Sequence, residues 1–164
     1  MTTTVRAARP SDSALIYGFI RDLAEYEKLL DEVDATEAGT AKALFGPDPR
    51  IFCDIVEVAG EPMGFALWFY NFSTFRGRHG IYLEDLFVRP QARGQGAGKA
   101  LLRALARRCI EEGLARLEWA VLNWNQSAIV FYDGLGAASK AEWTTRQLTG
   151  EALQELAAVE PAEA

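Results

Sequence analysis

Cysteine and histidine are scarce in this sequence, which limits the chemistry that its side chains can perform. The 164 residues include two cysteines and one histidine. Cys53 and Cys109 have neither the spacing of metal ligands nor a second pair with which to build a disulfide framework, so we expect two buried thiols in a reducing compartment. His79 has no acid or cysteine partner that the sequence identifies, so we expect it on the surface. No metal site is predicted.

Long hydrophobic runs and an excess of positive charge are also missing. No run approaches the ~18 apolar residues of a membrane-spanning helix, and the first residues lack the apolar core of a signal peptide. We therefore expect a cytoplasmic protein without membrane contact. The net charge of -6 and the isoelectric point near 4.9 argue against nucleic acid as the main partner. Acidic charge usually serves solubility, but it would also favour a cationic substrate.

Apolar residues are plentiful enough for a full hydrophobic core. They make up 49% of the sequence, and no linker or repeat divides it, so residues 1–164 are predicted to form one domain. The predicted strands are residues 5–8, 51–59, 63–72, 81–88, 117–122 and 143–148, and the predicted helices are residues 10–30, 37–46, 96–113 and 126–135. Antiparallel strands followed by crossover helices favour an α/β fold with a mixed sheet between helices.

Three of the predicted helices carry apolar residues at helical spacing. These stripes are Leu15, Phe19, Leu23, Tyr26 and Leu30 in the first helix, Leu101, Leu102, Leu105, Ala106 and Ile110 in the third, and Ala128, Phe131, Tyr132 and Leu135 in the last. Each stripe is predicted to face the core.

A glycine-rich loop joins the strand at 81–88 to the helix that begins near Gly96 and closes at Gly113. Gly94, Gly96 and Gly98 would let backbone N–H groups and the positive end of the helix dipole approach an anion. No acidic residue occurs between Leu86 and Ile110, whereas several arginines and Lys99 do. The segment is therefore predicted to bind a phosphate group.

Other interpretations of the loop can be compared by spacing. A Walker loop needs glycine where Arg93 stands and serine or threonine where Ala100 stands, so it is excluded. A dinucleotide fingerprint needs a third glycine where Lys99 stands, although Glu118 lies near the place of a ribose-binding acid, and this alternative stays open. A glycine-rich turn without a ligand also stays open.

The loop and its flanks resemble the acetyl-CoA-binding core of the GNAT N-acetyltransferases. The resemblance is carried by Arg93-Gly94-Gln95-Gly96-Ala97-Gly98, the preceding Leu83–Val88, and the later Trp124-Asn125-Gln126 and Phe131-Tyr132. It covers almost the whole chain and is closer to the branch of diamine (spermidine/spermine) and thialysine acetyltransferases. It implies a GNAT fold of about seven strands, antiparallel in the N-terminal part, with helices on both faces. It also implies a homodimer.

The resemblance implies acetyl-CoA as the cosubstrate. The loop from Arg93 to Lys99 would hold its diphosphate, and the strand end at Leu86–Val88 would contact the pantetheine arm and donate an N–H to the oxyanion. The residues expected to contact acetyl-CoA are Leu86, Phe87, Val88, Arg93, Gly94, Gln95, Gly96, Ala97, Gly98, Lys99, Asn125, Gln126, Ser127 and Ala128.

Catalytic roles follow from the same resemblance. Tyr132 would donate a hydrogen bond to the leaving sulfur, because a tyrosine with a pKa of ~10 is a weaker acid than a thiol at ~8.5. Glu84 would act as general base for the substrate ammonium, directly or through water. Asp85 should point to the opposite face in a regular strand, so only one of the two should meet the substrate unless a bulge intervenes.

The expected substrate is a small cationic primary amine: a polyamine, a diamine or a thialysine-like amino acid. Residues expected to contact it are Tyr26, Glu27, Glu84 and Glu142. Polyamine-specific relatives carry basic residues where this chain has Asp133 and Gly134. Direct attack in a ternary complex is favoured because the site motifs contain no cysteine or serine to form a covalent intermediate. The alternatives are an acyl-CoA-binding regulatory module without turnover and an acetyltransferase for a protein or peptide amine.

Overall fold

The computed structural model describes residues 2–158. The chain divides into two compact units, one ending at Ala120 and one beginning at Val121, and each is described by itself. The prediction of a single domain over residues 1–164 stays a prediction. In order, the first unit contains β1 (Thr3–Ala7), α1 (Ser13–Tyr26), α2 (Glu37–Phe45), β2 (Phe52–Val58), β3 (Glu61–Ser73), β4 (Arg78–Val88), α3 (Ala97–Glu111) and β5 (Leu117–Trp119), and the second contains α4 (Gln126–Asp133) and α5 (Gly150–Ala158).

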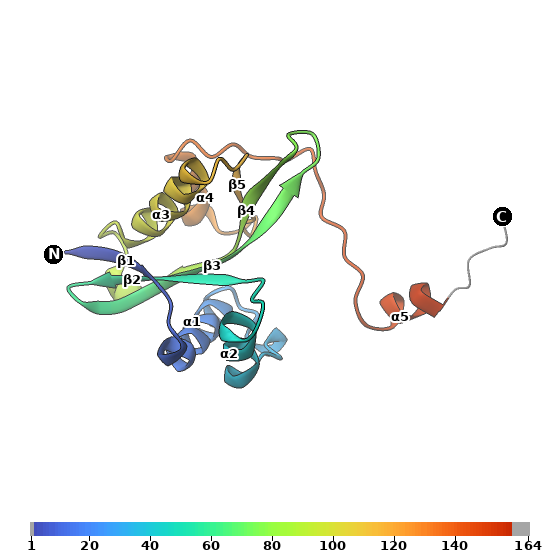
Figure 1. Ribbon diagram of the computed structural model, residues 1–164, viewed down its shortest axis with the longest axis horizontal. Coiled ribbons are helices and arrows are strands. Elements are labelled where there is room, and N and C mark those ends of the chain that lie inside the picture. Colours follow the sequence, from blue (N-terminus) through green and yellow to red (C-terminus); the bar gives the residue numbers. More distant parts are fainter. Residues whose placement is uncertain (1, 159–164) are drawn as a thin grey trace. The chain divides into compact units, whose positions relative to one another are not determined.

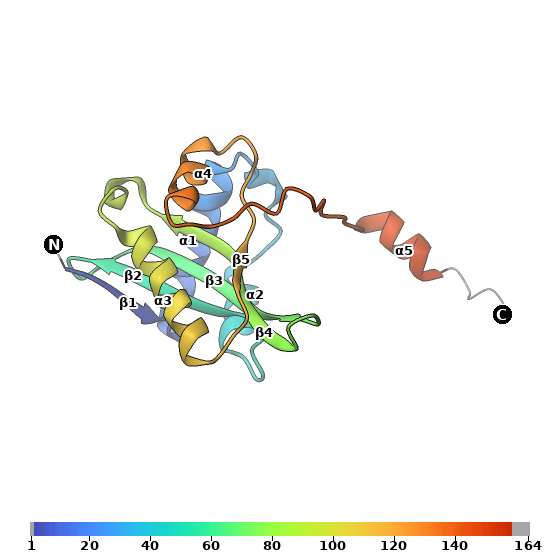
Figure 2. The same ribbon diagram turned by 90° about the horizontal axis from the view of Figure 1, so that it is seen from above.

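The sheet of the first unit follows the chain order β1-β2-β3-β4-β5. The first four strands pair antiparallel and β5 pairs parallel to β4. Helix α3 covers one face of this sheet, and α1 and α2 cover the other (Figures 1 and 2). The expected mixed sheet with an antiparallel N-terminal part and helices on both faces is confirmed.

The number of strands is smaller than expected. Residues 2–158 form five strands rather than about seven, and the strand predicted at residues 143–148 is wrong. Trp143 and Leu148 are 74% and 50% exposed there. Five positions separate them, so they would point to opposite faces of a strand and could not share a buried side. The strand predicted over residues 117–122 is shorter in the structure than expected, since β5 covers only Leu117–Trp119.

The hairpin of β3 and β4 is longer than predicted. Both strands continue to a turn at residues 74–77, so half of the loop expected at residues 73–80 is strand. His79 lies within β4 and is exposed, with its ring 5.0 Å from that of Phe72. Its predicted surface position is confirmed, but its placement in a loop is wrong.

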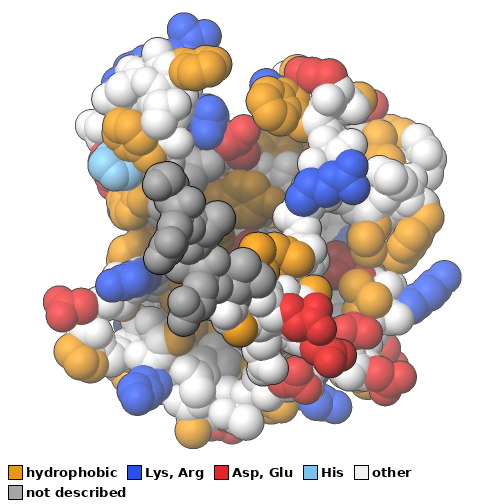
Figure 3. All heavy atoms as spheres, turned by 90° about the vertical axis from the view of Figure 1, so that its right-hand side faces the viewer, with side chains coloured by type: hydrophobic (Ala, Val, Ile, Leu, Met, Phe, Trp, Pro, Cys, Tyr) orange, Lys and Arg blue, Asp and Glu red, His pale blue; other side chains and the backbone are white. Residues whose placement is uncertain are grey.

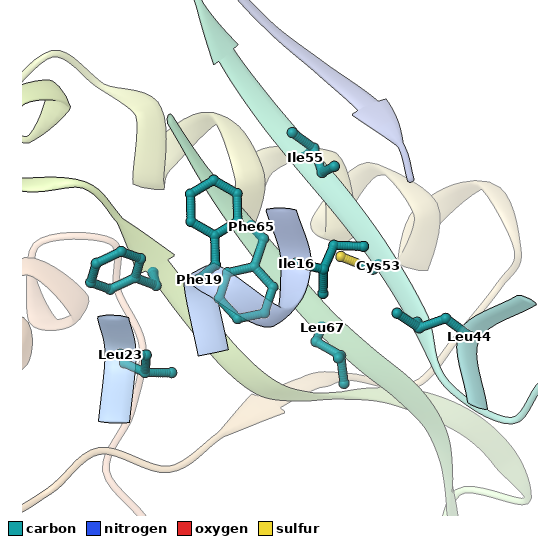
Figure 4. Packing of buried hydrophobic residues seen from close by; sticks show 9 residues of the cluster. Ile16, Phe19, Leu23, Leu44, Cys53, Ile55, Phe65 and Leu67 are labelled. Atoms are coloured by element: carbon teal, nitrogen blue, oxygen red, sulfur yellow. The ribbon is translucent and has the colours of Figure 1, made fainter. Parts of the chain in front are cut away.

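The main core lies between α1 and the sheet. Figure 4 shows Phe19 of α1 against Phe65 of β3, whose ring centres lie 5.6 Å apart in a stacked arrangement. The buried cluster consists of Ile16, Phe19, Leu23, Leu44, Cys53, Ile55, Phe65, Leu67 and Phe87. It fixes α1 against the strands from which the candidate site projects. Cys53 and Cys109 are both buried free thiols, as predicted.

Three helix stripes differ from their predictions. Helix α1 ends at Tyr26, so Leu30 lies outside it and is exposed. In α3 the buried position belongs to Cys109, while Ala106 is exposed and Ile110 is 83% exposed. Ile110 comes nine residues after Leu101, which is about two and a half turns and therefore the opposite side of the helix. Helix α4 has no buried residue, so the prediction that its apolar stripe faces the core is wrong.

Candidate active site

A β-bulge at Glu84 interrupts the pairing of β3 with β4. Leu67 of β3 lies opposite Asp85, and the next residue, Trp68, lies opposite Leu83. Glu84 is therefore the extra residue on β4, with no direct partner across the ladder. A bulge of this kind bends its strand and changes the direction of the side chains beyond it.

The bulge places two consecutive carboxylates on one face of the sheet. Leu67 belongs to the core cluster beneath α1, so its partner Asp85 also faces α1. Trp68 faces α3, whose Arg108 has its Cζ 5.0 Å from the centre of the indole ring, so Leu83 faces α3 as well. Glu84 follows Leu83 and points the other way, toward α1. The expectation that Asp85 faces away from Glu84 applies to a regular strand, and the bulge is the exception to it.

Asp85 is the most strongly perturbed carboxylate of this region. Burial, together with the neighbouring charges of Glu84 and Glu27, raises its pKa to about 6. Glu27 follows the last residue of α1, and burial also raises its pKa. Glu27, Glu84 and Asp85 therefore form a group of three carboxylates at the bulge, where a cation would offset the repulsion that Glu27 and Glu84 exert on Asp85.

The glycine-rich loop has the backbone geometry of an anion cradle. Gly94 and Gly96 have φ values of 73° and 83°, a backbone conformation that residues with a side chain rarely adopt. A Cβ at either position would meet nothing within 4 Å, so the space beside the loop is open. Helix α3 begins at Ala97 with a glycine at its N-cap, which leaves its first N–H groups without a side-chain cap.

Arg93 connects this loop to β4 and to α1. Its Nε donates a hydrogen bond to the carbonyl oxygen of Val88 at 2.8 Å. Its Cζ lies 4.7 Å from the centre of the Tyr26 ring and 5.5 Å from that of the Phe87 ring. Arg93 and the two aromatic residues border a pocket of about 400 Å³, which is lined by Asp22, Glu25, Tyr26, Phe87, Arg89, Pro90, Gln91 and Arg93.

The predicted site residues fall in both units. Tyr26, Glu27, Glu84 and the residues from Leu86 to Lys99 belong to the first unit, while Asn125 to Ala128, Tyr132 and Glu142 belong to the second. The Asn125 side chain caps α4 as predicted, accepting a hydrogen bond from the N–H of Ala128. Tyr132 is half-buried, with its ring 5.4 Å from that of Phe131. Glu142 is exposed, with its Oε1 3.9 Å from Nζ of Lys140.

From the sequence, Glu84 is favoured over Asp85 because a regular strand would place Asp85 on the opposite face. Two adjacent acids in an otherwise apolar strand were the available signal, but the bulge that joins them is visible only in the pairing of β3 with β4. Glu118, which suggested a ribose-binding acid, is engaged instead by the side-chain amide of Asn71 and by Nε of Arg116 at 3.0 and 2.7 Å.

Surface charge and composition add three observations. Acidic side chains gather on one part of the face shown in Figure 3, whereas basic ones are scattered over it. Across residues 2–158, no three or more histidine, cysteine, aspartate or glutamate side chains are arranged to hold a metal ion. Within the same residues no helix has the length and apolar character to cross a membrane.

Comparison with known families matches residues 16–137 to the Acetyltransferase (GNAT) family. The chain belongs to this family. It is therefore an acetyltransferase, and the resemblance noted in the sequence is confirmed. Family membership favours an acyl-CoA ligand for the loop over a dinucleotide.

Full-length relatives agree with this assignment. The thialysine N-epsilon-acetyltransferase of Bos taurus is 38% identical over 93% of this chain and 96% of its own. The L-ornithine N5-acetyltransferase of Arabidopsis thaliana is 31% identical over 94% of this chain and 87% of its own. Among solved structures, an integron cassette protein from the mobile metagenome of V. cholerae superposes with a TM-score of 0.79 at 26% identity, covering 97% of this chain and 99% of its own.

Proposed function

We propose that this GNAT enzyme transfers the acetyl group of acetyl-CoA to a primary amine of a small cationic molecule, by direct attack in a ternary complex. The observation that carries the proposal is the group of three carboxylates at the β4 bulge, which lies on the strand that leads into the anion cradle. A cation and an anion would thus be bound at neighbouring parts of one strand. The cytoplasmic location and the homodimer stay predictions.

The glycine loop fits the diphosphate of acetyl-CoA. The N–H groups at the start of α3, the open space beside Gly94 and Gly96, and the charges of Arg93 and Lys99 suit a phosphate ligand. When bound, acetyl-CoA supplies the thioester carbonyl carbon that the amine attacks. The backbone of Leu86, Phe87 and Val88 is proposed to orient its pantetheine arm, and Gln95, Ala97, Gly98 and residues 125–128 to contact it.

The carboxylates would first bind the substrate ammonium and then remove its proton. An alkyl ammonium has a pKa of ~10, so proton transfer to an ordinary carboxylate is strongly unfavourable. An acceptor with a pKa near 6, as Asp85 has, reduces that difference by about two units. We therefore add Asp85 as a proton acceptor beside Glu84, the base proposed from the sequence, with Glu27 holding the cation.

Tyr132 is proposed to donate a hydrogen bond to the sulfur that leaves. A phenol hydroxyl can stabilise the developing thiolate through this hydrogen bond without transferring its proton completely. Glu142 is proposed to contact the part of the substrate that does not react. Both residues belong to the second unit, and their roles are supported by the family resemblance.

The substrate class is supported by the names of the relatives. Thialysine and L-ornithine are amino acids with a primary amine at the end of the side chain, and both named enzymes align over nearly the whole of this chain. We propose an amino acid of this kind, with a diamine or polyamine as the next class.

The test is release of coenzyme A from acetyl-CoA in the presence of thialysine, lysine, ornithine, putrescine, spermidine or a lysine-containing peptide. We expect turnover with a free amino acid, and a loss of about 100-fold or more in Glu84→Gln and Asp85→Asn. Glu61→Gln, at the exposed start of β3, is the matched control and should keep full activity. Tight binding of acetyl-CoA without turnover on any amine would support the regulatory module instead, and turnover on the peptide alone a protein substrate.

A further inference from the structure

The sequence resemblance places Tyr26 at the border of the amine substrate, but its contacts in the structure involve Arg93 of the glycine loop. Cζ of Arg93 lies 4.7 Å from the centre of the Tyr26 ring, within the range of a cation–π interaction. Tyr26 is the last residue of α1, and α1 is fixed to the sheet through Phe19 and Leu23. The ring is therefore a support on a rigid element for an arginine in an exposed loop.

A second contact of Arg93 determines which N–H groups of its guanidinium remain available to bind a phosphate. The Nε of Arg93 donates to the carbonyl oxygen of Val88 at 2.8 Å, and the ring of Phe87 lies 5.5 Å from Cζ. The remaining four N–H donors belong to Nη1 and Nη2, the pair whose geometry matches two phosphate oxygens. Two aromatic rings and one carbonyl thus fix the plane and the direction of this group.

We propose that Tyr26 is a positioning residue for acetyl-CoA, which acts by holding the guanidinium of Arg93 ready for the diphosphate. This inference rests on the proposed function, because it requires acetyl-CoA as the ligand of the loop. It differs from the sequence expectation in a measurable way: replacement of Tyr26 affects the affinity for acetyl-CoA more than the affinity for the amine.

The experiment compares Tyr26→Phe, Tyr26→Leu and Arg93→Gln by steady-state kinetics with both substrates and by calorimetric titration of coenzyme A alone. Phenylalanine keeps the π face, so Tyr26→Phe should stay within twofold of the wild type. Tyr26→Leu removes the ring face and should raise the KM for acetyl-CoA and the Kd for coenzyme A about two- to fivefold. The KM for the amine should change by less than twofold.

A matched control lies on the same helix. Cζ of Arg21 lies 6.0 Å from the centre of the Tyr17 ring, outside the candidate site, so Tyr17→Leu removes a similar pair from α1 and should leave coenzyme A binding unchanged. The double variant Tyr26→Leu/Arg93→Gln should bind coenzyme A no more weakly than Arg93→Gln alone, because the tyrosine acts through the arginine.

Three outcomes would overturn the inference. These are coenzyme A binding that Tyr26→Leu leaves unaltered, a rise in the amine KM instead, and a loss of binding that is equal in the presence and absence of Arg93. A wild-type protein that binds no coenzyme A and acetylates no amine would overturn the proposed function, and this inference with it. Binding of coenzyme A by the wild type thus separates the two failures.

Discussion

Trp68 donates a hydrogen bond from its indole Nε1 to Oδ2 of Asp54 at 2.9 Å, on the face of the sheet that α3 covers. Asp54 is buried, and burial raises the pKa of its carboxyl, while the bond from Trp68 and the charge of Arg108 lower it. The net effect is a raised pKa, so the bond from Trp68 and the charge of Arg108 favour the ionised carboxylate but do not fully offset burial.

Replacement of Trp68 by phenylalanine should destabilise the protein by about 1–3 kcal/mol, because it leaves a buried acceptor without its donor. The loss should be larger at pH 7 than at pH 4, since the missing bond stabilises the ionised carboxylate. Urea unfolding at the two pH values measures this difference. Trp143→Phe, at a position that is 74% exposed, is the control and should change stability by less than about 0.5 kcal/mol.

Asp85 should make folding less favourable as the pH rises. Its folded pKa of about 6 lies above its usual value of 3.8, so the folded state holds the proton more tightly than the unfolded state. Its contribution to stability is fully present below pH 3.8 and is lost between there and about pH 6. Asp85→Asn should therefore stabilise the protein at pH 7 by about 1–3 kcal/mol and have little effect at pH 3.5.

A second prediction concerns activity. Asp85→Asn should also lose turnover if Asp85 assists deprotonation of the substrate ammonium. Urea midpoints and initial rates on one preparation test both parts. An Asp85→Asn protein that is no more stable at neutral pH than the wild type would contradict the raised pKa.

Gly96→Ala should weaken binding of coenzyme A by forcing an alanine into a φ of 83°. The backbone cost is about 1–2 kcal/mol, and relaxation of the loop to avoid it would turn N–H groups away from the ligand. Gly60 has a φ of 82° and the same open surroundings in the turn between β2 and β3. Gly60→Ala should therefore lose as much stability as Gly96→Ala but keep its affinity for coenzyme A. Equal affinities of the two variants for coenzyme A would contradict the role of the glycine loop as an anion cradle.

Tyr132→Phe should lower kcat by about 100-fold while the Kd for coenzyme A stays within twofold, since only the hydroxyl is removed. The circular dichroism of the variant should match that of the wild type, because the ring that contacts Phe131 is kept. Unchanged kcat would assign Tyr132 a structural role. Phe131→Leu is a neighbouring control that leaves the hydroxyl in place.

The order of strands and helices could be predicted from the sequence because local patterns determine it. The run from Ile81 to Val88, Pro90 after it and the glycines that follow predicted a strand, a loop and a helix, and the structure has β4, the loop and α3 in those places. The cap of α4 by Asn125 was predictable for the same reason, since a cap involves residues only three positions apart.

Features that depend on distant residues could not be predicted. The bulge at Glu84 arises from the register between Leu67 and Asp85, which no pattern within β4 records. The proximity of Tyr26 and Arg93 likewise joins the end of α1 to a loop that lies far along the chain.

The bulge in β4 also changes the phase of the strand. Side chains alternate with a period of two residues, so the extra residue at 84 reverses which faces the residues after it occupy. In an uninterrupted ladder, Asp85 and Phe87 would turn toward α3, and Leu86 and Val88 would take their places beneath α1. Deletion of a single residue here would thus exchange the core side and the outer side of the strand end, whereas a substitution at Glu84 alters one side chain. The fold of this strand end should therefore depend more on the length of the segment than on the side chain at position 84.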